Sequence, residues 1–200
     1  MNKSFNKLYK ELVDITDRLN KYNIQYWLDA GTLLGIYRNN QLISFDGDFD
    51  FGLYANKFDI QKLSKAMNSI EYYHWIEKSH IHKIKFLKKP NIKVDFFLFN
   101  ELNDYYYHEE WNGFFVFKKS CLNILQKFKC NDNYFYIPNN PKLYLEDLYG
   151  TDWKTPNPNF KKPRDYKNYI CHNITTKKTH QLTSERIKYA KKMGWIENAS

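Results

Sequence analysis

Three aspartates occupy alternate positions in a largely apolar stretch, LISFDGDFDFGLY, at residues 42–54. Side chains alternate between the two faces of an extended strand, so Asp46, Asp48 and Asp50 are expected on one face. Aspartate is disfavoured in strands and like charges on one face repel each other, so the arrangement is costly unless a cation neutralises it. Carboxylate oxygens suit Mg²⁺ or Mn²⁺. The pattern therefore predicts a divalent-metal site, and a polar turn at Asp46 and Gly47 is the alternative.

A fourth aspartate lies in a second apolar stretch, KVDFFLF. Asp95 is flanked by apolar residues in a predicted strand, where burying an unpaired carboxylate would be expensive. A cation shared with the first group would compensate that cost. We therefore predict that Asp48, Asp50 and Asp95 converge as catalytic residues and metal ligands. Asp46 is predicted as a further metal ligand, and a role as a turn residue is the alternative.

The surrounding pattern predicts the elements that would position these acids. Apolar residues recur at helical spacing over 5–19, a short buried strand follows in IQYWLDAG, and TLLGIYR continues as a short helix or turn. Further predicted elements are a helix over 57–68, a hairpin of HKIKFL and NIKVDFFLF, a weak helix over 119–128, a helix from Pro141 towards Gly150, and a final helix over 184–193. The aromatic stretch 100–117 shows no clear pattern. This order predicts an α+β fold, in which helices flank a small mixed sheet and the C-terminal part is helical and rich in loops.

Length and composition favour one domain over residues 1–200, with a core over about 5–100 and an extension over about 101–200. No apolar run approaches the roughly 18 residues of a membrane span, and the N-terminus lacks the pattern of a signal peptide. The three cysteines are an odd number without metal-ligand spacing, which favours reduced thiols. We therefore expect a soluble cytoplasmic protein. Its net charge of +9 favours an anionic partner, whether nucleic acid, anionic lipid or a phosphorylated small molecule.

The order of the motifs is typical of the nucleotidyltransferase fold: a strand followed by Gly31 and Thr32, then a D-x-D strand, then a later strand with one buried acid. More narrowly, residues 26–53, YWLDAGTLLGIYRNNQLISFDGDFDFGL, resemble the LicD and fukutin-related family of phosphotransferases. The downstream VDFF and the stretch YIPNNPKLYLEDLYGTDWKTP resemble two further elements of that family. Ala30 and Gly47 depart from its usual pattern.

The resemblance implies transfer of a substituted phosphate, such as phosphocholine or an alditol phosphate, from a CDP-linked donor to a sugar hydroxyl of a glycan or glycolipid. Two Mg²⁺ or Mn²⁺ ions held by the predicted acids would neutralise the donor diphosphate. Gly31 would let the backbone approach the donor phosphate, and Thr32 would supply a hydroxyl and an N–H there. Arg38 would pair with phosphate oxygens, and an exposed position in a loop beside Asn39 and Asn40 is the alternative.

Two other functions are compatible with the sequence. A nucleotidyltransferase that moves a nucleoside monophosphate would use the same three acids, and a basic, aromatic-rich chain would suit a non-catalytic nucleic-acid-binding module. We expect an enzyme that forms no stable complex with nucleic acid, and we leave peripheral membrane contact open. Tyr149, Asp152 and Trp153 are expected to shape the acceptor pocket, with a plain core position as the alternative for Trp153. A structural or hydrogen-bonding role is expected for Asp29.

Overall fold

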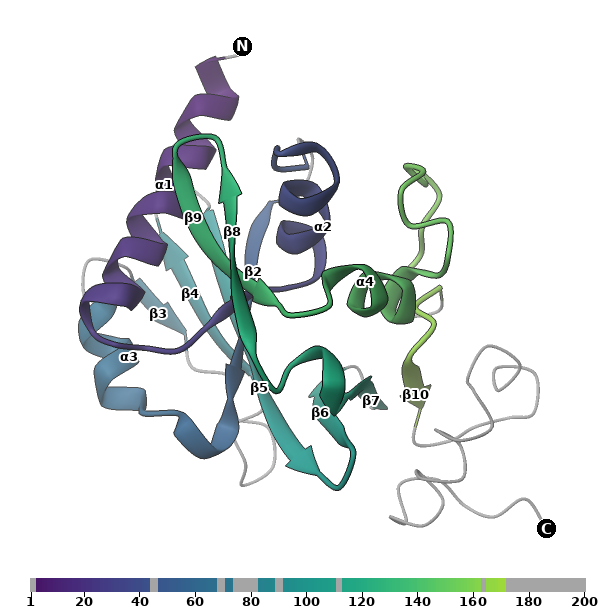
Figure 1. Cartoon of the computed structure of the whole chain (residues 1–200). Helices are drawn as coiled ribbons and strands as arrows, with labels where there is room; N and C mark the ends of the chain where they lie inside the picture. The colour runs from purple at the N-terminus through teal and green to yellow at the C-terminus, as the bar shows by residue number, and fades with distance from the viewer. Residues whose placement is uncertain are drawn as a thin grey trace, which may run out of the picture.

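The computed structural model describes residues 3–43, 47–67, 71–73, 83–88, 92–110, 113–162 and 165–171. Its centre is an eight-stranded sheet in the order β1-β2-β5-β6-β7-β10, with β4 paired to β5 and β3 paired to β4 (Figure 1). The strands are β1 (Trp27–Leu28), β2 (Asp48–Tyr54), β3 (Glu71–Tyr73), β4 (Lys83–Lys88), β5 (Ile92–Leu102), β6 (Tyr105–Glu110), β7 (Gly113–Lys118) and β10 (Tyr169–Cys171). The pair β2–β5 is parallel, and the other pairs of this sheet are antiparallel. The expected mixed sheet is therefore confirmed, and it is larger than expected.

The described α-helices are α1 (Lys3–Lys21), α2 (Ala30–Asn39), α3 (Ile60–Ala66) and α4 (Pro141–Tyr149). The apolar face of α1 buries Leu12 and Leu19 in the core. Helix α4 begins with Asn140 as its N-cap and Pro141 in its first turn, and it ends at Gly150, which has a positive φ of 97°. These are the start and stop signals that the sequence indicated. No described helix combines the length and the hydropathy that crossing a bilayer requires.

Aromatic side chains of β1, β2 and β5 pack together at the centre of the core. The ring centroids of Trp27 and Phe99 are 4.8 Å apart, and the rings of Phe51 and Phe96 stack at 5.1 Å. Gly52 lies opposite Trp27 in the β1–β2 pair, where a Cβ would lie 2.1 Å from the Trp27 ring. The Trp27 ring can lie against β2 only because this position is glycine.

The chain after residue 100 contains more strand than the sequence indicated. The expected weak helix over 119–128 is wrong. After a short 3₁₀ turn at Lys119–Cys121, the segment forms β8 (Leu125–Cys130), which pairs with β9 (Asn133–Pro138) in a separate two-stranded sheet. Strand β9 also contacts β1. Pairing and packing of this kind override weak local propensity, which is why the sequence pattern was misleading here.

Other expectations have mixed outcomes. The hairpin of β4 and β5 and the helix α3 are confirmed, and the unassigned stretch 100–117 supplies the end of β5 together with β6 and β7. The expected final helix over 184–193 lies outside the described residues. The expectation of one domain over residues 1–200 therefore stays a prediction.

Candidate active site

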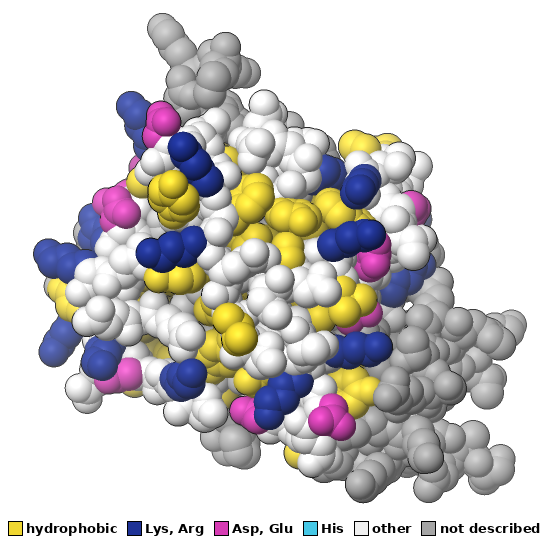
Figure 2. Space-filling model, in the orientation of Figure 1, with side chains coloured by type: hydrophobic (Ala, Val, Ile, Leu, Met, Phe, Trp, Pro, Cys, Tyr) yellow, Lys and Arg dark blue, Asp and Glu magenta, His cyan; other side chains and the backbone are white. Residues whose placement is uncertain are grey.

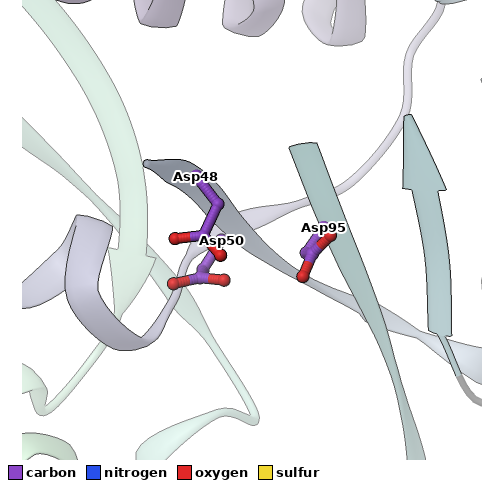
Figure 3. Close-up of side chains that lie close together, drawn as sticks. All are labelled: Asp48, Asp50 and Asp95. Atoms are coloured by element: carbon purple, nitrogen blue, oxygen red, sulfur yellow. The ribbon is translucent and has the colours of Figure 1, made fainter. Parts of the chain in front are cut away.

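The predicted acids Asp48, Asp50 and Asp95 come together on two neighbouring strands (Figure 3). Strands β2 and β5 are parallel, and Asp50 lies directly opposite Asp95 in their register. Asp48 precedes Asp50 by two residues, so both side chains lie on the same face of β2. Carboxylate oxygens from the three residues all lie within 4.8 Å of one another. The predicted convergence is confirmed. Metal binding and catalysis by these residues stay predictions, and Asp46 lies outside the described residues.

The alternation of β2 and β5 separates this acid cluster from the core. Phe51 and Phe96 follow Asp50 and Asp95 by one residue, and their stacked rings are buried on the opposite face of the sheet. Asp50 and Asp95 are only 4% and 2% exposed. Carboxylates this close and this buried repel one another strongly when ionised. A set of three oxygen donors fits Mg²⁺ or Mn²⁺ better than it fits softer metals.

These acids line a cavity of about 250 Å³, which we call the acid cavity. Its wall also includes Asp29, His108, Glu110, Lys162 and Tyr166. Burial, followed by the negative charges of Asp50 and Glu110, raises the pKa of Tyr166 well above its ordinary value. The Tyr166 hydroxyl therefore keeps its proton at neutral pH and can donate a hydrogen bond inside the cavity. Sequence reasoning identified Asp29 but missed His108, Glu110, Lys162 and Tyr166, because neither β6 nor the stretch around residues 162–166 carries a recognisable motif.

Asp29 connects the acid cavity to two helices. Its Oδ1 accepts a hydrogen bond of 2.7 Å from the Ala30 N–H at the start of α2 and one of 2.6 Å from the Tyr144 hydroxyl on α4. Tyr144 is fully buried, and its burial, together with the charge of Asp29, raises the pKa of Tyr144 well above its ordinary value. The structural role expected for Asp29 is confirmed, because this carboxylate ties α4 to the N-terminus of α2.

Gly31 and Thr32, which were predicted to approach the donor phosphate, are buried in the first turn of α2. The Thr32 hydroxyl accepts a hydrogen bond of 2.9 Å from the Asp50 N–H, and the Asp29 N–H donates to the Asp50 carbonyl at 3.0 Å. Thr32 therefore fixes the start of α2 against the acid strand, a function that the motif alone did not reveal. The predicted phosphate contacts of both residues stay predictions.

Arg38, the third predicted phosphate ligand, lies in the last turn of α2. Its Nη1 donates a hydrogen bond of 3.3 Å to the carbonyl of Trp153, which lies 115 residues later. Both residues line a second cavity of about 400 Å³, together with Tyr149 and Asp152. We call it the aromatic cavity. Arg38 is thus a wall residue of the aromatic cavity, and its predicted contact with phosphate stays a prediction.

Comparison with known proteins decides the family. Residues 23–140 match the family described as LicD/FKTN/FKRP, nucleotidyltransferase domain. The chain belongs to this family. The matched region contains β1, α2 and the acids of β2 and β5, so it includes the whole acid cluster. This membership confirms the resemblance seen in the sequence.

Proteins named ribitol-5-phosphate transferase FKTN, from Homo sapiens and Macaca fascicularis, are 29% identical to this chain over 175 residues. The alignment covers 76% of this chain and 34% of each relative, so the chain spans about a third of the length of these relatives. An uncharacterized protein of Rickettsia prowazekii is 27% identical over 202 residues, which cover 96% of this chain and 71% of that protein.

A solved structure supports the fold. The lincosamide antibiotic adenylyltransferase LnuA, in its lincomycin-bound form, is similar with a TM-score of 0.50 and 16% sequence identity. The match covers 72% of this chain and 94% of that chain. At this identity the likeness speaks only for the fold, and it confirms the expected nucleotidyltransferase-like α+β class.

Proposed function

We propose that this protein is a Mg²⁺- or Mn²⁺-dependent phosphotransferase that moves a substituted phosphate from a CDP-linked donor to a sugar hydroxyl of a glycan. The observation that carries the proposal is the convergence of Asp48, Asp50 and Asp95 within 4.8 Å at a partly open cavity. The relatives named ribitol-5-phosphate transferase support a phosphorylated alditol as the transferred group. Among the described residues, Cys121 and Cys130 are buried and form no disulfide, which suits a reducing compartment and so supports the cytoplasmic location included in this proposal.

The acids have distinct roles in the proposed reaction. Asp48 and Asp50 would hold the divalent ions, and Asp95 would complete the ligand set and orient the acceptor hydroxyl. When bound, the ions neutralise charge on the donor diphosphate and on the oxygens that attack and leave. The acceptor oxygen forms a new bond to the distal phosphorus, the bond between that phosphorus and the oxygen of CMP breaks, and CMP leaves. The hydroxyl proton passes to Asp95.

Two other side chains of the acid cavity act on the donor in this scheme. The Tyr166 hydroxyl, which stays protonated, donates a hydrogen bond to a phosphate oxygen. Lys162 supplies a positive charge to the same cavity. Tyr166 would stabilise negative charge that increases as CMP departs, which is the kind of electrostatic assistance that accelerates phosphoryl transfer. Lys162, which is exposed, would attract the anionic donor and thereby lower its KM.

Product analysis tests this reaction directly. The purified protein is incubated with Mn²⁺, a glycan acceptor and CDP-ribitol, CDP-glycerol or CDP-choline, and the products are identified by mass spectrometry. The proposal expects release of CMP, with the substituted phosphate on the acceptor. Attachment of CMP to the acceptor, or release of pyrophosphate from CTP, would instead identify a nucleotidyltransferase. Asp48→Asn is the matched inactive control, because it removes one carboxylate charge without changing the size of the side chain.

A separate measurement tests the alternative of a nucleic-acid-binding module. On the face shown in Figure 2, Lys and Arg side chains are interspersed with acidic and apolar ones, without the continuous basic stripe typical of such modules. An RNA-binding module would bind with steep salt dependence and would tolerate Asp48→Asn. The proposed enzyme shows no stable RNA complex at physiological salt and loses turnover in that variant.

A further inference from the structure

The aromatic cavity lies between α2 and the segment that follows α4. Its wall is mainly apolar, with Leu34, Ile43, Trp153, Pro156, Pro158 and Phe160 as the main apolar contributors. Its volume of about 400 Å³ lies within the range of roughly 300–1,000 Å³ typical of small-molecule sites. The hydrogen bond from Arg38 to the Trp153 carbonyl holds this segment against α2, so the cavity is formed before any ligand arrives.

The aromatic cavity adjoins the acid cavity. Lys162 lines both of them. Ala30 faces the acid cavity while the next residue, Gly31, faces the aromatic cavity. Tyr149 of the aromatic cavity packs against Tyr166 of the acid cavity, with ring centroids 5.5 Å apart. One ligand whose phosphates lie at the acid cluster can therefore extend into the aromatic cavity.

We infer that the aromatic cavity binds the nucleoside of the nucleotide-linked donor, an inference that rests on the proposed function. The charged side chains in its described wall are Arg38, Lys162 and Asp152, which leave a net positive charge. That charge disfavours a quaternary ammonium such as choline, although aromatic walls would otherwise suit one. A polyol needs a hydrogen-bond partner for each hydroxyl, which a mainly apolar wall does not supply. A neutral planar ring joined to an anionic phosphate fits both the apolar wall and the positive charge.

Filling the cavity tests the inference. In Ile43→Trp and Thr155→Trp a large ring is introduced at two separate positions of the wall. Binding of CMP is measured by calorimetry in the presence of Mn²⁺, and binding of Mn²⁺ alone is measured on the same preparations. We expect at least tenfold weaker CMP binding in both variants, with unchanged Mn²⁺ affinity. Asn159→Trp is the matched control, because Asn159 is an exposed residue of the same segment that is not in the wall.

The possible results separate this inference from the proposed function. CMP affinity in the filled variants equal to that of the wild type would overturn the inference. A second result would also overturn it: the filled variants bind ribitol 5-phosphate or phosphocholine more weakly while their CMP binding is unchanged. The cavity would then hold the transferred group. Unchanged Mn²⁺ affinity shows that a filled variant is folded. The proposed function fails separately, if the wild type binds CMP here but transfers nothing from any CDP-linked donor.

Discussion

The two cavities are built in opposite ways. The acid cavity is dominated by carboxylates from β2 and β5, two strands joined by a regular parallel register in which Asp50 faces Asp95. The aromatic cavity has a mainly apolar wall contributed by α2 and by a segment more than a hundred residues later, as the 115-residue separation of Arg38 and Trp153 shows. Chemistry that depends on strand periodicity can be recognised in a sequence. A binding pocket made of apolar side chains looks like ordinary core.

The two cavities are nevertheless coupled. The hydrogen bond from Tyr144 to Asp29 joins α4, which leads into the aromatic cavity, to the start of α2, which borders the acid cavity. In addition, Lys162 lines both cavities. Substitutions at the acid cluster, at this connection and at Lys162 therefore test whether the cavities serve a metal and a donor separately or act as one site.

The largest effect is expected for Asp50→Asn. Turnover should fall by about 1,000-fold, the order of effect seen when one preorganised electrostatic group is removed from an active site. The metal-free variant should nevertheless melt at the same temperature as the wild type or higher, because one of three clustered like charges is gone. Steady-state kinetics and thermal melting in EDTA measure the two effects. Asp132→Asn, at an exposed turn residue, should change neither. If Asp50→Asn has a lower melting temperature but retains turnover, the acid cluster has a structural role and no catalytic role.

Metal addition should stabilise the wild-type protein. At a Mn²⁺ concentration of about 100 times its dissociation constant, the free energy of unfolding should rise by about 2.7 kcal/mol. Asp95→Asn should remove most of that gain, because the ligand on the neighbouring strand is lost. Thermal melting with and without Mn²⁺ measures the difference. An equal gain in the variant would mean that the ion binds elsewhere.

Tyr144→Phe should lower stability without disturbing the acid cluster. A hydrogen bond to a charged group contributes about 1.5–3 kcal/mol, and its loss leaves the buried Asp29 carboxylate less well satisfied. Urea unfolding measures the loss, and Tyr134→Phe, at a residue that is 58% exposed, is the matched control. Mn²⁺ affinity should stay unchanged, because the register of β2 and β5, and not α4, sets the positions of the three carboxylates. Loss of Mn²⁺ affinity in a folded Tyr144→Phe protein would contradict that separation.

The smallest effect is expected for Lys162→Ala. Lys162 is exposed yet borders both cavities, so we expect the KM of the CDP-linked donor to rise about tenfold, equivalent to about 1.4 kcal/mol. Lys161→Ala is the matched control, since this exposed neighbour borders neither cavity. Initial-rate measurements at varied donor concentration compare the two variants. Equal KM values would show that Lys162 has no contact with the donor.

The amino-acid sequence alone predicted the elements whose signals are local. The apolar repeat of α1, the cap residues of α4 and the β4–β5 hairpin follow from neighbouring residues, and the period of two in β2 puts Asp48 and Asp50 on one face. Asp95 was identified because a carboxylate in so apolar a strand needs compensation. In each case the physical information lies within a few residues along the chain.

Only the tertiary structure decided what depends on distant partners. Strands β8 and β9 form a hairpin that packs against β1, far earlier in the sequence, and local propensity had suggested a helix at β8 instead. Tyr166 and Lys162 reach the acid cavity because the segment after α4 passes beside the sheet, and Thr32 bonds to the Asp50 N–H because α2 packs on β2. These contacts join residues far apart in sequence, and no periodicity or spacing records them. Side-chain types along the chain therefore indicated the chemistry, whereas packing between distant segments set the shape of the site.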